Sequence, residues 1–221
     1  MSDFSTARGK MVDGQVRPSD VTDPRIIDAM TVLPREIFVP EDRRALAYLD
    51  LDLDVGEKGA PKRHLIKPVV VAKMIQAAEI KTTDNVLVVG CATGYTAALM
   101  AKLADRVTAT ESDPALAAKA SDNLASLGLR HVTIVPATAS NGAPARAPYD
   151  VIILEGATEI VPDTLYGQLA PEGRLVGVFA IGGAPRAVIV TRSRSDFGSR
   201  PLFDASAPIL PGLERPPAFV F

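Results

Sequence analysis

The sequence predicts an α/β fold built on a mostly parallel, doubly wound sheet. Short apolar runs suited to buried strands alternate with helical segments over residues 86–181. Gly90 and Gly94 mark a tight turn between the first of these runs and the next helix. Gly182 and Gly183 precede another apolar run, which predicts an antiparallel hairpin at one edge of the sheet.

The elements follow in order along the chain. Asp113 with Pro114 is a typical helix start, and Gly128 is a typical helix stop. The apolar run "VLVVG" lacks any polar alternation, as expected for a strand buried on both faces. The predicted strands are 86–90, 106–111, 132–136, 149–156, 174–181 and 186–193, and the predicted helices are 95–104, 113–128 and 161–173.

The N-terminal part predicts a helical elaboration that precedes the sheet. Asp23 and Pro24 begin one helix, which Pro34 ends, and Pro40 begins another. Residues 49–68 lose periodicity and predict a long loop, and residues 69–80 return to a helix. We therefore expect an N-terminal helical region with a substrate loop over 1–68 and a cofactor-binding domain over 69–221, packed as one unit.

Composition and net charge indicate which kinds of protein and which kinds of partner the sequence favours. Of the 221 residues, 47% are hydrophobic and 23% charged, as in an ordinary globular protein. A net charge of -2 gives no electrostatic reason to expect nucleic acid or a membrane as partner. Cys91 is the single cysteine, so an intramolecular disulfide is excluded and a cytoplasmic location is expected. The oligomeric state stays open.

The turn after the first predicted strand carries the chemistry. Glycines there let a backbone approach a ligand closely, and the amides of the next helix face that ligand. The spacing Gly90, Ala92, Gly94 lacks the third glycine of a dinucleotide fingerprint, so it favours a nucleoside without a pyrophosphate. Glu111 ends the second strand at the distance where an acid binds ribose hydroxyls. The alternative is ordinary strand-to-helix punctuation with Glu111 as a solvated charge.

Three segments resemble the protein-L-isoaspartate O-methyltransferases. They are "DPRIIDAMTVLPREIFVPEDRRALAYLDLDLDVG", "KPVVVAKMIQAAEIKTTDNVLVVGCATGY" and "APYDVIILEGATEIVPDTLYGQLAPEGRLVGVF". The resemblance implies a Rossmann-like class I methyltransferase fold, S-adenosylmethionine as cofactor, a protein or peptide carboxylate as methyl acceptor, and a role in protein repair. It also implies that the cofactor contacts Gly90, Cys91, Ala92, Thr93, Gly94, Glu111 and Thr138.

The chain departs from the family pattern at three places. The family motif Gln-Thr-Ile-Ser-Gln-Pro aligns with residues 63–68, which puts Ile66 where the hydroxyl orients the acceptor. Ile66 can neither donate nor accept a hydrogen bond. Ala92 replaces the middle glycine of the turn, and Thr138 replaces an aspartate that meets the adenine.

Arg63, His64 and Lys67 supply positive charge in the same segment. We hypothesise that these basic side chains hold an acidic acceptor, and that the loop from Gly59 to Lys67 covers it. A carboxylate is already ionised at neutral pH and needs no general base, so orientation is the main requirement.

Other readings remain open. A non-catalytic relative that binds the nucleoside or a partner, and a methyltransferase with a different acceptor, both fit the departures; an NAD-linked oxidoreductase fits least. Cys91 is interpreted as small turn filler, and His64 with His131 does not suggest a metal site. Asp52 and Asp54 alternate with apolar residues and predict an edge strand.

Overall fold

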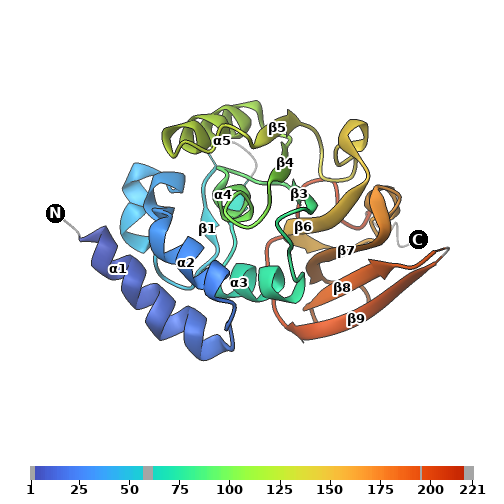
Figure 1. Ribbon diagram of the computed structural model, residues 1–221, viewed down its shortest axis with the longest axis horizontal. Coiled ribbons are helices and arrows are strands. Elements are labelled where there is room, and N and C mark those ends of the chain that lie inside the picture. The colour runs from blue at the N-terminus through green and yellow to red at the C-terminus, as the bar shows by residue number, and fades with distance from the viewer. Residues whose placement is uncertain (1–2, 57–61, 195, 217–221) are drawn as a thin grey trace, which may run out of the picture.

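A computed structural model describes residues 3–56, 62–194 and 196–216. In these ranges a seven-stranded sheet has the order β5-β4-β3-β6-β7-β8-β9 (Figure 1). The five strands from β5 to β7 are parallel, while β8 and β9 are antiparallel, which confirms the predicted fold class and edge hairpin. The strands are β3 Asn85–Val89, β4 Arg106–Glu111, β5 Thr133–Pro136, β6 Tyr149–Thr158, β7 Leu169–Phe179, β8 Arg186–Arg192 and β9 Phe197–Asp204.

The helices start where the sequence places caps. Asp23 accepts the amide of Arg25, and Asp113 accepts the amides of Ala115 and Leu116. The α-helices are α1 Phe4–Met11, α2 Pro24–Val32, α3 Pro68–Ala77, α4 Tyr95–Met100, α5 Pro114–Ser126 and α6 Asp163–Tyr166. A π-helical turn, η1 Val12–Val16, and the 3-10 turns η2 Arg17–Ser19, η3 Arg35–Phe38, η4 Glu41–Leu46 and η5 Pro144–Arg146 complete the set. None of the helices among the described residues is long and apolar enough to cross a bilayer.

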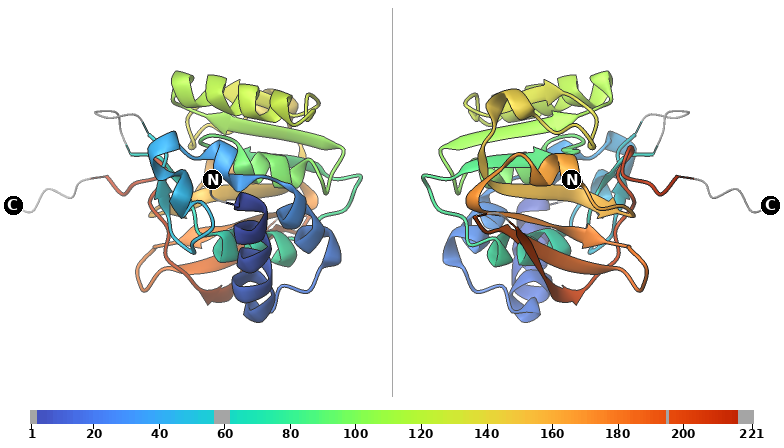
Figure 2. Two further views of the ribbon diagram at one scale, coloured as in Figure 1. Left: turned by 90° about the vertical axis from the view of Figure 1, so that its left-hand side faces the viewer. Right: turned by 90° about the vertical axis from the view of Figure 1, so that its right-hand side faces the viewer.

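The sheet buries both faces, but the two faces have different cover. Val86 and Val88 pack into a core shared with the N-terminal helices and with α3, α4 and α5. Leu87 and Val89 point to the other face, where α6 and the C-terminal segment contribute Leu165, Leu210 and Leu213. In Figure 2, the N-terminal helices face the viewer in the left view, and α6 faces the viewer in the right view. Burial on both faces explains why these strands are uniformly apolar.

Several elements differ from the sequence prediction, and strand β9 is absent from the predicted strands. The predicted helix 161–173 ends at Tyr166, and β7 begins at Leu169 because Leu169 pairs with Tyr149 of β6. A Cβ at Gly173 would meet the backbone oxygens of Ala170 and Tyr149 at 2.8 Å, so this glycine permits a close approach of backbones within the sheet. The predicted helix after Pro40 is the short 3-10 turn η4.

The predicted loop 49–68 contains a small hairpin. Strand β1 Leu53–Asp54 pairs antiparallel with β2 His64–Leu65, which places Asp54 in a strand as expected. The amide of Val55 also donates to the carbonyl of Arg63 at 2.7 Å. The hairpin therefore sets the position of Arg63. Residues 59–61 of the predicted acceptor loop lie outside the described residues.

The chain after β9 returns across the ends of the strands. The amide of Ala157 donates to the Pro208 carbonyl at 2.8 Å, and the Leu210 amide donates to the Ala157 carbonyl at 2.9 Å. Ile209 forms a parallel bridge with Ala157. Residues 208–210 are thus packed on the sheet at the carboxyl end of β6, as the apolar residues of this segment predict.

Replacing Asp113 with alanine removes the acceptor for two amides at the start of α5. We expect the free energy of unfolding to fall by about 1 kcal/mol, as for other lost N-caps. Urea denaturation measures the change. The matched control is Asp122→Ala on the exposed face of the same helix, which should stay within about 0.5 kcal/mol of the wild type. Equal losses in the two variants would contradict a capping role.

Candidate cofactor site

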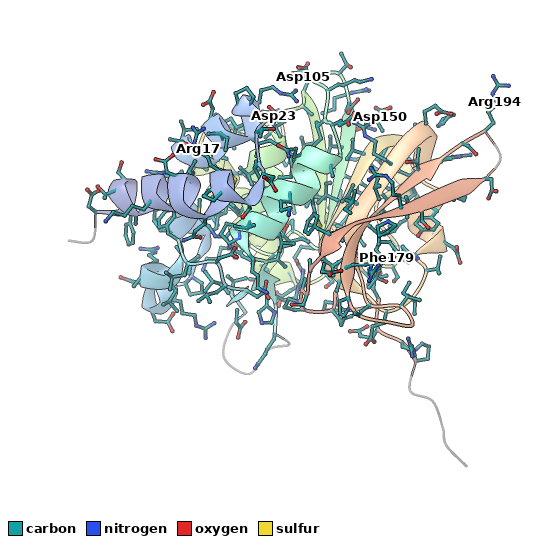
Figure 3. All side chains as sticks on the ribbon, turned by 90° about the horizontal axis from the view of Figure 1, so that it is seen from below. Arg17, Asp23, Asp105, Asp150, Phe179 and Arg194 are labelled. Atoms are coloured by element: carbon teal, nitrogen blue, oxygen red, sulfur yellow. The ribbon has the colours of Figure 1, made fainter. Side chains whose placement is uncertain are left out.

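The site lies where the parallel strands end and their order reverses. Chain connections from β3 run outward to β4 and β5, whereas β6 and β7 lie on the other side of β3. Ligands of open α/β sheets bind outside the carboxyl ends of the strands at this reversal. In Figure 3, Asp105 and Asp150 mark the edge where strands begin, and Phe179 marks the opposite edge, where β7 ends.

The glycine turn follows β3 at the carboxyl edge. Gly90, Ala92 and Gly94 have φ of 72°, 50° and 99°, so all three are left-handed. Alanine adopts this region at a cost, whereas glycine does so readily. The turn is closed by the Gly94 amide, which donates to the Cys91 carbonyl at 2.8 Å, and it is tied to β4 through Thr110. A Cβ at Gly94 would meet Ala120 of α5 at 3.2 Å.

Glu111 is completely buried at the end of β4. Its Oε1 accepts the amides of Ser112 at 2.9 Å and Asp113 at 3.1 Å, and the Nε of Arg63 at 3.2 Å. Its Oε2 accepts the Ala92 amide at 2.8 Å and Arg63 Nη2 at 2.7 Å. This carboxylate is therefore a buried, multiply bonded charge, and the alternative of a solvated strand-end charge is wrong.

Arg63 lies on the cofactor side of the site. Besides its two bonds to Glu111, its Nη2 donates to the Gly90 carbonyl at 3.0 Å, and its side chain is 6% exposed. The sequence-based hypothesis assigned Arg63 to an acidic acceptor, together with Lys67. The structure directs them to different acids, because Lys67 Nζ lies 3.8 Å from Asp52 Oδ2.

His64 and Ile66 lie between Arg63 and Lys67 in the chain. Ile66 is fully buried in the core, and its carbonyl accepts Nη2 of the buried Arg35 at 2.9 Å. His64 is in β2 and half-buried, and that burial lowers its pKa below the ordinary histidine value. Among the described residues, no group of three or more His, Cys, Asp or Glu side chains is arranged to hold a metal ion.

The remaining predicted cofactor residues divide into buried and exposed. Thr93 is buried, and its hydroxyl donates to the Phe38 carbonyl at 2.6 Å, which ties the turn to the N-terminal region. Cys91 is fully buried, and burial raises the pKa of its thiol, consistent with turn filler rather than a nucleophile. Thr138 is exposed after β5, whose end is joined to Glu111 by a backbone bond from Ala137.

Sequence reasoning missed a second buried acid, Glu155. It lies near the end of β6, beside the glycine turn, since Val89 of β3 pairs with Leu154. The side chain is 1% exposed, and neither carboxyl oxygen has a hydrogen-bond partner. Burial raises its pKa to about 7, although the nearby Thr96 hydroxyl partly offsets this. The available signal was a lone acid within the apolar run "YDVIILEG".

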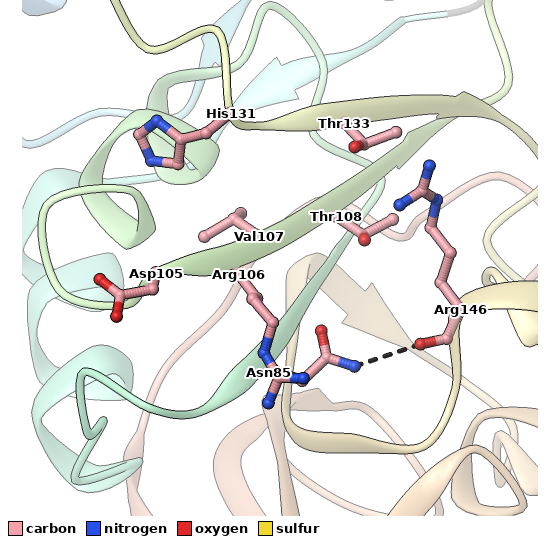
Figure 4. Close-up of a pocket in the computed structure, with 8 residues that line it drawn as sticks. All are labelled: Asn85, Asp105, Arg106, Val107, Thr108, His131, Thr133 and Arg146. Carbon is pink, nitrogen blue, oxygen red and sulfur yellow. Dashed lines mark hydrogen bonds between the residues drawn. The ribbon is translucent and has the colours of Figure 1, made fainter.

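A polar pocket of about 290 Å³ opens at the other edge of the sheet (Figure 4). Its residues come from the starts of the strands, and Asn85 Nδ2 donates to the Arg146 carbonyl at 3.1 Å across it. His131 lines the same pocket and is exposed, as its position before a strand predicts. The pocket therefore lies away from the glycine turn and is separate from the candidate site.

The fold and the glycine turn together define the class of domain to which this chain belongs. A parallel sheet with a glycine turn after β3 and a buried acid after β4 is the arrangement of Rossmann-like nucleoside-binding domains. The family described as protein-L-isoaspartate(D-aspartate) O-methyltransferase matches residues 7–196. The chain belongs to this family, whose members are S-adenosylmethionine-dependent methyltransferases.

Individual relatives agree with this placement. The chain is 39% identical over 194 residues to protein-L-isoaspartate O-methyltransferase 1 of Rhodopseudomonas palustris, covering 87% of this chain and 78% of the relative. It is 39% identical over 196 residues to the Geobacter metallireducens enzyme, covering 89% and 88%. A solved protein-L-isoaspartate O-methyltransferase superposes with a TM-score of 0.83 at 23% identity, over 94% of this chain and 67% of that chain.

A further solved structure shares the fold. It is a Plasmodium falciparum protein described as a putative protein-L-isoaspartate O-methyltransferase in complex with S-adenosyl-L-homocysteine. The TM-score is 0.76 at 16% identity, and the match covers 92% of this chain and 97% of that chain. Both structural matches confirm the Rossmann-like class I methyltransferase fold that the sequence resemblance implies.

The raised pKa of Glu155 predicts a pH dependence of stability. The folded protein holds this proton up to about pH 7, whereas an unfolded carboxyl loses it near its ordinary pKa of 4.5. Stability from this group is therefore fully present below pH 4.5 and is lost as the pH rises through about 7. The loss is on the order of 3 kcal/mol at about 1.4 kcal/mol per pKa unit.

The variant Glu155→Gln keeps the shape and removes the titration. Urea denaturation between pH 5 and pH 8 should show that the free energy of unfolding of the variant increases relative to that of the wild type as the pH rises. Parallel stability profiles for the two proteins would show that Glu155 does not titrate in this window.

Proposed function

We propose that this chain transfers a methyl group from S-adenosylmethionine to a carboxylate of an altered aspartyl residue in a protein or peptide. Its membership of the isoaspartyl methyltransferase family supports the reaction class. The observation that carries the cofactor part is Glu111, buried at the end of β4 within 2.8 Å of the Ala92 amide in the glycine turn. This is where an acid would meet the ribose of a nucleoside.

The residues present fit the nucleoside only in part. The left-handed turn and the position of Glu111 suit it. However, the oxygens of Glu111 already accept five N–H donors, and two of these belong to Arg63. A ribose diol donates to the same carboxylate, so Arg63 and a ribose compete for it. When bound, the cofactor would supply the methyl group.

The acceptor side needs orientation rather than proton transfer. An acceptor carboxylate is ionised at neutral pH, so the chain needs only to hold it in line. Ile66 is buried and provides no hydroxyl for this. We retain Lys67 as the candidate acceptor-binding cation, because its side chain is 30% exposed and its 3.8 Å contact with Asp52 is long. A cytoplasmic location, expected from the single cysteine, is part of the same proposal.

A second candidate is a methyltransferase that uses a different acceptor. Glu155 favours it, because a buried acid beside the turn would repel a carboxylate when ionised. An acceptor that donates a hydrogen bond would instead satisfy the unpartnered oxygens of Glu155.

Methyl incorporation distinguishes the two candidates. We expect the protein to transfer labelled methyl groups from S-adenosylmethionine to an isoaspartyl peptide, and not to a peptide of the same sequence with ordinary aspartate. Scintillation counting of the separated peptides measures transfer. If neither peptide is labelled while S-adenosylhomocysteine still binds, the isoaspartyl acceptor is wrong and the second candidate gains support.

Lys67→Gln should raise the KM for an isoaspartyl peptide by roughly tenfold, the equivalent of one lost charge-assisted hydrogen bond. The affinity for S-adenosylhomocysteine should stay unchanged, because the side chain points to Asp52 and not to Glu111. Lys119→Gln, at an exposed position of α5, makes the same charge change as a control. A KM that moves equally in both variants would assign the effect to net charge alone.

A further inference from the structure

The hydrogen bonds of Glu111 leave no vacancy for a ligand. An ionised carboxylate offers about four lone-pair positions. Here five N–H donors approach it at 2.7–3.2 Å, three from backbone amides and two from Arg63. The three amides belong to the turn and to the start of α5, so they are fixed by the fold. The Arg63 donors come from a side chain on a separate hairpin.

Space over the glycine turn is also taken by the chain itself. A Cβ on Gly90 would meet Leu210 Cδ2 at 2.6 Å and Arg63 Nη2 at 3.0 Å. At Gly156, near the end of β6, a Cβ would meet Leu210 Cγ at 2.8 Å and the Pro208 carbonyl at 2.9 Å. The close approach that glycines allow at this edge is therefore made by Leu210, the Pro208 carbonyl and Arg63.

Among the described residues, the pocket beside Arg63 is small. A pocket of about 230 Å³ is lined by Arg63, Ser112, Asp113, Pro114 and Pro211. Ligand pockets are commonly about 300–1,000 Å³. Arg63 forms one wall of this pocket, so a movement of its guanidinium away from Glu111 would both enlarge the space and free two acceptor positions.

We propose that Arg63 is a resident competitor for the ribose, and that it sets the affinity of this chain for its nucleoside cofactor. This inference rests on the proposed function, since it takes Glu111 as the ribose acceptor. The guanidinium neutralises the buried carboxylate and holds the hairpin β1–β2 over the turn while no nucleoside is bound. Nucleoside binding then requires Arg63 to leave Glu111.

The two residues over the turn differ in how they are held. The segment that carries Leu210 is fixed to β6 through its backbone, because the Leu210 amide donates to the Ala157 carbonyl and the Ala157 amide donates to the Pro208 carbonyl. Arg63 reaches Glu111 through its side chain, and within the described residues its backbone carbonyl accepts a bond from the Val55 amide. A side-chain rotation is therefore enough to release Glu111, whereas moving Leu210 requires breaking the bridge to β6. The competition consequently falls on Arg63.

The size of the effect follows from the fraction of molecules with Arg63 released. Apparent affinity falls in proportion to the population that is competent to bind. A buried, doubly bonded ion pair keeps that population low. If a tenth or less of the molecules have Arg63 released, removing the guanidinium should tighten nucleoside binding by about tenfold or more.

Calorimetric titration with S-adenosylhomocysteine tests this on the full chain. Arg63→Gln removes the charge and the paired donors but leaves the three backbone amides on Glu111. We expect the variant to bind at least tenfold more tightly than the wild type. Arg43→Gln is the matched control, because Arg43 belongs to the same region and pairs with Asp54, away from Glu111. It should bind like the wild type.

A second variant, Arg63→Met, keeps the apolar stem without any donor and should also bind more tightly. Circular dichroism and thermal unfolding establish that each variant is folded. Because a merely structural arginine would only lose affinity when replaced, a gain of affinity is specific to competition.

The other outcomes separate this inference from the proposed function. Tight binding by the wild type with weaker binding by both Arg63 variants would overturn the competition and leave the cofactor assignment standing. Absence of binding in the wild type and in both folded variants would overturn both, because freeing Glu111 would then not create a nucleoside site.

Discussion

The buried carboxylate of Glu111 is the constraint on which the candidate site depends. An ionised carboxyl with no solvent contact is tolerated only when it is paired and fully hydrogen-bonded. Here it gathers the turn after β3 through Ala92, the start of α5 through Ser112 and Asp113, and the hairpin β1–β2 through Arg63. Three segments far apart in the sequence are thus held at one point at the carboxyl edge of the sheet.

A second buried carboxyl group, that of Glu155, lies in an environment very different from that of Glu111. Glu155 lies near the end of β6, beside the strand that carries the turn, yet its oxygens have no partner and its pKa is raised to about 7. Glu111 is therefore surrounded by hydrogen-bond donors, whereas burial without such donors raises the pKa of Glu155. Arg35 is buried in the same core, and its guanidinium lies 4.5 Å from the centroid of the Tyr95 ring. Its Nη1 has no hydrogen-bond partner. The core near the turn thus contains the fully hydrogen-bonded carboxylate of Glu111 together with unsatisfied polar atoms on Glu155 and Arg35.

Local periodicity predicted most of the secondary structure, because the central strands β3 and β6 are buried on both faces and each helix cap is a contiguous signal. It failed at residues 161–173, where β7 begins at Leu169 through pairing with Tyr149. The sequence of an apolar stretch with a glycine is compatible with either a helix or a strand. Here the strand is selected by pairing with β6, which begins twenty residues earlier in the chain. The pairing of β1 with β2 was not predicted, although Asp52 and Asp54 indicated an edge strand within the predicted loop, because each strand has two residues and shows no periodicity.

The sequence by itself predicted the alternation of strands and helices from β3 to β8, the glycine turn after the first parallel strand, and the acid at the end of the next one. These are local features, written in residues that are neighbours in the chain. Only the tertiary structure decided what surrounds that acid. Arg63 meets Glu111 across 48 positions of sequence, and Leu210 reaches Gly90 from the far end of the chain. Such contacts arise from how the hairpin and the tail pack on the sheet, and no periodicity or spacing encodes them.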